Sequence, residues 1–258
     1  MTPEDVVRHT KQIVIMAGAA FGKTDRFRAR GEGLGLSRWP FYFGARAGVL
    51  GDVDAEVVTA ACGFFAPELV RSAWDTARAV IPLSGIVEAD VEECTHWARI
   101  TYGDLPELDQ LADLAERVVE AAEPTGRPLF AAWRSLTVAD EDPVSRVGLA
   151  LLRLREHRGA SHLIAIHEYG LTPLRAILAG PGVDKARANG WSGPWPSMST
   201  TDPVALAGAD QRTDELAAAP YAALTPAERV HFVRLLGQVH NAYEHRQQPE
   251  TGVKDQQR

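Results

Sequence analysis

Signals for helix N-termini recur along this chain, and they constrain its fold more than any other feature. A proline or a capping residue precedes an apolar run of helical period at Pro67, Asp142–Pro143, Thr172–Pro173 and Thr225–Pro226. Proline is favoured at the first helical position, and Thr and Asp are favoured as N-caps. No alternation of apolar and polar residues persists over a useful length. The sequence therefore predicts an all-α fold with at most a small β element.

The clearest of the predicted helices follows Asp104 and Glu107, which have the spacing of a capping box. An apolar stripe at i, i+3 and i+4 positions continues from there until Pro124. An earlier helical hairpin is predicted over residues 54–80, where Asp54 can cap the first helix and Pro67 can begin the second. The N-terminal half is therefore expected to be helical throughout.

A helix-turn-helix is predicted in the second half of the chain. One helix opens at Asp142 and stops at Gly159, and a short helix over 161–168 follows. A tight turn then leads to a helix over 172–179, which gives the spacing of a helix-turn-helix. Residues 180–203 are rich in Gly, Pro, Ser and Trp without a regular period. They are predicted to form a loop or a degenerate wing.

The length of 258 residues, with 45% hydrophobic residues, fits one large or two small globular domains. We expect a helical N-terminal domain over residues 1–139 and a winged-helix-like helical domain over 140–246. A polar tail over 247–258 is expected to be disordered. A cleft between the two domains is the expected place for a binding site.

The charge balance argues against a nucleic-acid partner. Lys and Arg number 27 against 34 for Asp and Glu, so the formal net charge is −7. Neutralising phosphates requires the opposite sign. Arg175 is the only basic residue of the expected recognition helix over 172–179. The sequence therefore predicts that the chain does not bind nucleic acid, and winged-helix architecture does not itself require DNA binding.

Two cysteines, Cys62 and Cys94, form no CxxC pair and no disulfide framework, which suits a reducing compartment. The N-terminus is acidic where a signal peptide is basic, and the apolar stretch over 13–21 is too short for a membrane span. We expect a cytoplasmic protein with no membrane contact, as a homo- or hetero-oligomer.

One glycine-containing stretch, Gly18–Thr24, resembles a phosphate-binding loop but misses the required spacing by one residue. We interpret it as a helix-loop junction. His162 and His167 lie five residues apart, which does not place two imidazoles on one helical face for a metal. The sequence therefore predicts neither a cofactor nor a metal.

A polar cluster around residues 156–162 is the main candidate for chemistry. His157 and His162 could exchange protons, Glu156 lies beside them, and Arg158 could bind an anion. The same residues could instead cap a helix C-terminus, where Arg and His are favoured by the helix dipole. Both interpretations remain open.

Aromatic side chains and a further arginine could complete a pocket. Arg46 follows the aromatic run Phe41–Phe43 and could hold an anion or pair with a buried carboxylate. Tyr42, Trp133 and Trp191 could wall a ligand pocket or simply anchor loops by packing.

Six short stretches occur in collinear order within about residues 8 to 243: Tyr42–Ala47, Phe64–Pro67, Gly126–Ala132, Leu154–Gly159, Gly190–Trp191 and Thr213–Pro220. Together they resemble an actinobacterial family of helix-turn-helix or winged-helix-like proteins. The chain departs from the pattern of that family in two places. Ala160 stands where the family has an acidic residue, and this chain has Trp133 where the family has a histidine nearby. The chain also resembles the aziridine-forming cyclases of antibiotic pathways.

These resemblances imply a cofactor-independent enzyme or binding protein of secondary metabolism that acts on a small molecule. In an aziridine-type ring closure, an amine displaces an anionic leaving group; His157 or His162 would take the proton, and Arg46 and Arg158 would hold the anion. Two alternatives stay open: a ligand-responsive winged-helix transcriptional regulator, and a non-catalytic subunit of a hetero-oligomer.

Overall fold

The computed structural model describes residues 1–138 and 142–247. Within those ranges the chain forms thirteen α-helices and three short 3-10 helices, and no strand is present. The all-α prediction is therefore confirmed. The tail expected to be disordered lies outside the described residues, except that Gln247 ends the last helix. None of the described helices combines the length and the apolar character needed to cross a membrane.

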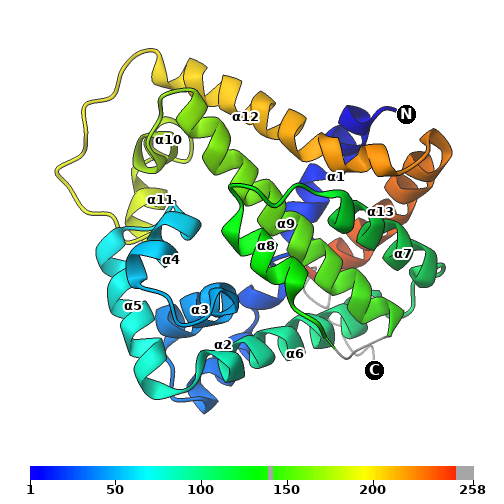
Figure 1. Ribbon diagram of the computed structural model, residues 1–258, viewed down its shortest axis with the longest axis horizontal. Coiled ribbons are helices and arrows are strands. Elements are labelled where there is room, and N and C mark those ends of the chain that lie inside the picture. Colours follow the sequence, from blue (N-terminus) through cyan, green and yellow to red (C-terminus); the bar gives the residue numbers. More distant parts are fainter. Residues whose placement is uncertain (139–141, 248–258) are drawn as a thin grey trace, which may run out of the picture.

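The helices follow one another with short connections, and Figure 1 shows their arrangement. In chain order they are α1 (Pro3–Ala17), η1 (Phe21–Lys23), α2 (Asp25–Gly33), α3 (Arg38–Ala47), η2 (Gly48–Leu50), α4 (Ala55–Cys62), α5 (Pro67–Val80), α6 (Leu83–Tyr102), α7 (Leu108–Ala121), α8 (Pro128–Ser135), α9 (Pro143–Glu168), α10 (Pro173–Ala179), α11 (Val183–Ala188), α12 (Asp202–Ala218), η3 (Ala219–Ala223) and α13 (Pro226–Gln247).

Helix α9 runs through the middle of the molecule and packs against α1, α6, α7, α8 and α12 (Figure 1). The prediction that this helix stops at Gly159 is wrong, because the helix is 26 residues long and continues past Gly159 to Glu168. Glycine inside a helix costs about 1 kcal/mol relative to alanine. Burial of Ala160, Ser161 and Ala165, which follow the glycine in the sequence, offsets that cost.

Buried side chains of α9 belong to three core clusters. Val147, Leu151 and Leu154 pack with residues of α1, α7 and α13, whereas Leu149 and Leu152 pack with residues of α2, α3 and α6. Ala165 and Ile166 pack with residues of α10 and α12. A further cluster joins α3, α4 and α5. The division of the chain into domains near residue 139 stays a prediction.

The helix-turn-helix geometry that was expected is present at the end of α9. Gly170 adopts a left-handed conformation with φ of 72°, which a glycine tolerates in a tight turn. Thr172 then caps α10, because its Oγ1 accepts a hydrogen bond of 3.3 Å from the amide of Arg175. The predicted start and end of this helix are confirmed.

Helix α11 corrects the prediction that residues 180–203 lack regular structure. This helix of six residues leaves Lys185 and Arg187 exposed and buries Ala186 completely. A single buried position generates no sequence period, which explains why the helix was missed. Residues 190–201 do form the expected loop, and it projects from the body between α11 and α12 (Figure 1).

Two predicted helix caps have opposite outcomes. The cap at Thr225 is confirmed, and it is a capping box with Glu228, since each backbone amide donates to the other residue's side chain, at 2.7 and 3.3 Å. The box at Asp104 and Glu107 is wrong, because Glu107 itself is the N-cap and has a left-handed φ of 61°. Its carboxylate instead accepts a hydrogen bond of 2.8 Å from Arg234 of α13.

Candidate functional site

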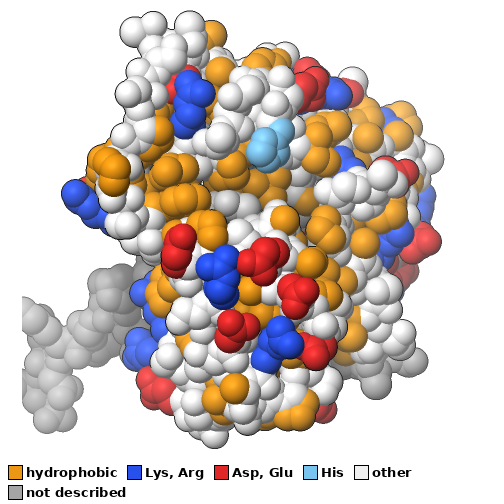
Figure 2. All heavy atoms as spheres, turned by 60° about the vertical axis from the view of Figure 1, so that its left-hand side comes forward, with side chains coloured by type: hydrophobic (Ala, Val, Ile, Leu, Met, Phe, Trp, Pro, Cys, Tyr) orange, Lys and Arg blue, Asp and Glu red, His pale blue; other side chains and the backbone are white. Residues whose placement is uncertain are grey.

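A cavity of about 590 Å³ lies between α3, α9, α10 and α12, and we call it the arginine cavity. It brings together four of the side chains that the sequence singled out. Figure 2 shows the side of the molecule on which α10 and α11 lie, where hydrophobic side chains gather over the upper half. The predicted site residues that line the cavity are Tyr42, Arg46, Arg158 and His162.

A buried ionic cluster forms one wall of the arginine cavity. Arg46 donates two hydrogen bonds to the Glu156 carboxylate, from Nε at 3.0 Å and from Nη2 at 2.8 Å. Arg155 adds a third at 2.5 Å, and Arg46 Nη1 donates to the Tyr42 hydroxyl at 3.3 Å. Glu156 is only 2% exposed. The Glu156 carboxylate is therefore held in place by two guanidinium groups.

Opposing effects set the charge of this cluster. Burial alone would raise the pKa of Glu156, but Arg46 and Arg155 outweigh it and the pKa is lowered. Burial would likewise lower the pKa of Arg46, and the Glu156 carboxylate raises it instead. The Glu156 carboxyl and the Arg46 guanidinium are therefore both charged at neutral pH. Two cations against one anion leave an excess positive charge facing the cavity.

Arg158 contributes a second excess of positive charge. Its Nη2 pairs with the Asp214 carboxylate at 2.6 Å, and Lys11 pairs with the other oxygen of the same carboxylate at 2.6 Å. Arg158 Nη1 is buried and has no hydrogen-bond partner among the described residues. An unmet buried donor costs about 1 to 3 kcal/mol. Arg158 lines the arginine cavity, so its guanidinium adds positive charge there.

His162 is the histidine that opens into the arginine cavity. Its Nδ1 lies 3.0 Å from Thr213 Oγ1, whose own proton is donated to the Ala209 carbonyl. The hydroxyl can therefore only accept, so Nδ1 carries the ring proton and Nε2 is left as a proton acceptor. Burial lowers the pKa of His162, which keeps the ring neutral at pH 7. Phe64 stacks on the ring at 5.5 Å.

His157 does not line the arginine cavity. The side chain is 3% exposed, and its ring meets the edge of Phe130 at 5.0 Å. Burial, followed by the nearby charge of Arg127, lowers the pKa of His157 to about 3. The structure thus places the two predicted histidines in different surroundings, although they lie only five residues apart on one helix.

The two predicted tryptophans support the cavity from outside it. Trp133 is buried beneath Arg46 and donates from Nε1 to the Arg46 carbonyl at 3.0 Å. Trp191 donates to the Phe64 carbonyl at 3.0 Å, and Asn189 Nδ2 donates to the same oxygen at 3.0 Å. Trp191 therefore anchors the α11–α12 loop to the segment that carries Phe64.

Asp90 is a buried carboxyl group that sequence reasoning missed. It is 4% exposed and lines a cavity of about 50 Å³ next to Arg46, Glu156 and Trp133. Burial, with the Glu156 charge second, raises the pKa of Asp90 to about 8. The signal was available, because Asp90 interrupts the apolar row of its helix midway between Ile86 and Cys94.

Two further observations limit the reactions that this site can support. Burial raises the pKa of the neighbouring Cys62 to about 11, so its thiol is not an activated nucleophile. Among residues 1–138 and 142–247, no three His, Cys, Asp or Glu side chains gather as metal ligands would. The arrangement can hold an anion against guanidinium groups and accept a proton at His162.

Comparison with known proteins gives one match. The model of a helix-turn-helix family matches residues 7–198, whereas searches of curated proteins and of solved structures found no match. The family match overturns the expectation of no nucleic-acid partner, since helix-turn-helix proteins are typically DNA-binding. The net charge is a sum over the whole surface, so it does not describe the charge of any one face of the molecule. The chain belongs to the helix-turn-helix family.

Proposed function

We propose that this protein is a DNA-binding regulator whose arginine cavity binds a small anionic molecule. One observation carries the proposal: the cavity wall is shared between the arginines and the helix-turn-helix elements. Arg46, Arg155 and Arg158 line one side, while Ala176 and Ile177 of α10 line the other, together with Lys185 of α11. A ligand in this cavity would touch both the charged cluster and the helices that follow the turn.

The charges in the cavity favour an anionic ligand. The Arg46–Glu156–Arg155 cluster has an excess of one positive charge, and the Arg158–Asp214–Lys11 cluster has another. Lys185 adds a third positive charge and Asp210 removes one. Guanidinium groups bind carboxylates and phosphates with paired hydrogen bonds. A carboxylate, sulfate or phosphate ester of a small organic molecule fits this site.

Coupling between ligand and DNA follows from the packing of α10. This helix packs against α9, α11 and α12, and Ala176 and Ile177 are buried in those contacts. A ligand that favours one position of α10 moves α11 with it, and such couplings are typically about 1 to 3 kcal/mol. Helix α11 presents Lys185 and Arg187 to solvent, whereas Arg175 of α10 is engaged by the buried Asp202.

Two matched variants test whether α11 contacts DNA. Arg187 and Arg28 are 65% and 62% exposed, and each pairs with an aspartate three residues earlier in the chain. Duplexes selected from a random library would be titrated by fluorescence anisotropy at several salt concentrations. We expect R187A to reduce the slope of log affinity against log salt by about one, and R28A to leave it unchanged. Equal behaviour of the two variants would contradict the placement of DNA at α11.

A second candidate function, small-ring closure, is favoured by the neutral His162 that opens into the same cavity. In that reaction, an amine nitrogen of the substrate attacks carbon, the carbon–oxygen bond breaks, and an anion such as sulfate leaves. His162 Nε2 takes the proton from nitrogen, and Arg158 holds the departing anion.

The test for ring closure uses 2-aminoethyl hydrogen sulfate as the probe and measures sulfate release. We expect H162Q to abolish release and H167Q, a change at an exposed histidine of the same helix, to preserve it. Release at the same rate in both variants would refute a role for His162. Turnover with no duplex selected from the library would favour this function over regulation.

A further inference from the structure

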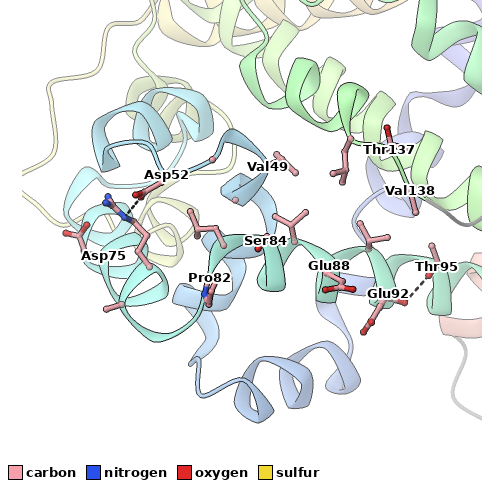
Figure 3. A pocket seen from close by; sticks show the side chains of 18 of the residues that line it. Val49, Asp52, Asp75, Pro82, Ser84, Glu88, Glu92, Thr95, Thr137 and Val138 are labelled. Atoms are coloured by element: carbon pink, nitrogen blue, oxygen red, sulfur yellow. Dashed lines mark hydrogen bonds and ion pairs between the residues drawn. The ribbon is translucent and has the colours of Figure 1, made fainter.

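A large groove lies along α6, on a different part of the molecule from the arginine cavity, and we call it the α6 groove. Its volume is about 1440 Å³. One wall is α6, and the opposite wall is formed by η2 and residues 136–138, with the end of α5 beside them (Figure 3). None of its lining residues belongs to the arginine cavity.

Two parallel rows of side chains give this groove an amphipathic wall. Positions four apart on a helix share a face, and each spacing of four advances the helix by about 6 Å. The apolar row on α6 consists of Leu83, Val87 and Val91, and apolar side chains of Val49, Leu136 and Val138 face it across the groove. The polar row consists of Ser84, Glu88 and Glu92, and Figure 3 shows these three side chains in line along the helix.

The groove carries excess negative charge. Four carboxylates line it, from Asp52, Asp75, Glu88 and Glu92, against the two arginines described next. Arg78 pairs with Asp52 at 2.8 Å, and Arg99 pairs with Asp142 at 3.1 Å.

Glu88 is the least engaged of these carboxylates. Glu92 pairs with Arg30 of α2, whereas Glu88 is exposed and forms no ion pair with any residue that the structure describes. Its charge is therefore available to a cation that enters the groove.

We propose that the α6 groove binds an organic cation with a bulky apolar body. The apolar body would lie on the Leu83–Val87–Val91 row and on Val138 opposite, where burial of apolar surface is favourable. The positively charged nitrogen would lie beside Glu88 and Glu92. The volume exceeds the roughly 300 to 1,000 Å³ of a typical small-molecule pocket, which favours a body of several fused rings. This inference is independent of the proposed regulator function.

Two dyes with the same xanthene core separate charge from apolar contact. Rhodamine 6G is a cation and fluorescein is an anion at pH 7.5, and both report binding through fluorescence anisotropy. We expect the full chain to bind rhodamine 6G and to bind fluorescein at least about tenfold more weakly, because the carboxylates repel an anion. Fluorescein could also enter the arginine cavity, so both dyes are titrated against R158Q as well, in which anion binding at that cavity is weakened. Equal affinity for the two dyes in R158Q, or binding of neither, would overturn the proposal.

Substitutions then place the dye in the groove. E88Q should weaken rhodamine 6G binding about threefold and E88K about tenfold, which are the sizes expected for an exposed charge pair. E120Q, which removes an exposed carboxylate from α7, is the matched control and should leave the affinity unchanged. V91T keeps the shape of the apolar row but adds a hydroxyl, and it should also weaken binding. Rhodamine 6G binding that is unaffected by E88K and V91T would refute the groove as the site.

Discussion

The arginine cavity and the α6 groove hold similar numbers of charged groups but hold them in opposite ways. In the cavity, Glu156 is 2% exposed and bound by two guanidinium groups. In the groove, Glu88 is exposed and has no ion pair among the described residues. Burial of a charge costs several kcal/mol unless partners compensate it, whereas an exposed charge costs almost nothing. The fold therefore depends on the charges of the cavity but not on the charge of Glu88.

The difference also separates two ways of recognising a ligand. Charges in the cavity are fixed in position before a ligand arrives, so a bound anion meets an ordered set of donors. Charges along the groove remain hydrated, so they attract a cation without fixing its orientation. We expect narrow selectivity in the cavity and broad selectivity in the groove.

The largest expected effect comes from removing the central carboxylate of the cavity. E156A leaves Arg46 and Arg155, whose side chains are 17% and 26% exposed, beside each other without the carboxylate that pairs them, and we expect a loss of about 3 kcal/mol in the free energy of unfolding. E88A, the corresponding change in the groove, should alter it by less than about 0.5 kcal/mol. Urea unfolding followed by circular dichroism measures both. Losses of similar size would show that the two regions do not differ as described.

A smaller effect, which depends on pH, is expected at Asp90. Burial raises its pKa to about 8, so the folded protein retains a proton that the unfolded chain has lost above about pH 4. The stability contributed by this group therefore falls as pH rises between about 4 and 8. D90N removes the ionisation, so its stability relative to the wild type should rise from almost no gain at pH 4 to a clear gain at pH 8, by about 1.4 kcal/mol for each unit by which the pKa is raised.

Urea unfolding of D90N across pH 4 to 8 measures this difference, and D104N, at an exposed aspartate, is its control. The difference between D104N and the wild type should stay constant across the same range. A constant difference for D90N as well would mean that Asp90 is ionised in the folded protein.

Local signals predicted most of the helices, because a cap or a proline acts within one turn. Thr172 and Thr225 cap helices as expected, since their partners lie three residues away. The capping box predicted for Glu107 is wrong, because Arg234, which lies 127 residues later in the chain, donates a hydrogen bond to the Glu107 carboxylate. The helix end predicted at Gly159 is wrong, because burial of residues on both sides of this glycine overrides its low helix propensity.

The site was predictable only in part for the same reason. Residue types alone indicated Arg46, Arg158 and His162, and the structure places them around one cavity. The pairing of Arg46 with Glu156 joins residues 110 positions apart, so no local pattern could reveal it. Asp90 had a readable signal, a carboxyl in an apolar row, although its neighbours in space were not predictable.

An intermediate effect is expected when Arg158 is replaced. R158Q keeps a polar side chain beside Asp214 but removes the cationic donor, so phosphate should bind about tenfold more weakly, which corresponds to about 1.4 kcal/mol. Isothermal titration of inorganic phosphate measures the affinity. R153Q provides the control, since Arg153 of the same helix donates to the carbonyls of Trp133 and Leu136 and does not line the cavity. Equal losses in R158Q and R153Q would mean that phosphate does not bind at the cavity.

Salt gives the smallest effect and the sharpest separation of the two regions. Between 0.05 and 0.5 M salt the screening length falls from more than about 10 Å to about 4 Å, which weakens exposed charge interactions but leaves buried ones almost unchanged. Rhodamine 6G binding in the groove should therefore weaken about threefold over this range. The destabilisation caused by E156A should change by less than about 0.5 kcal/mol, because both partners of Glu156 reach it inside the protein. A salt dependence of equal size in both measurements would mean that water and ions reach Glu156 as freely as they reach Glu88.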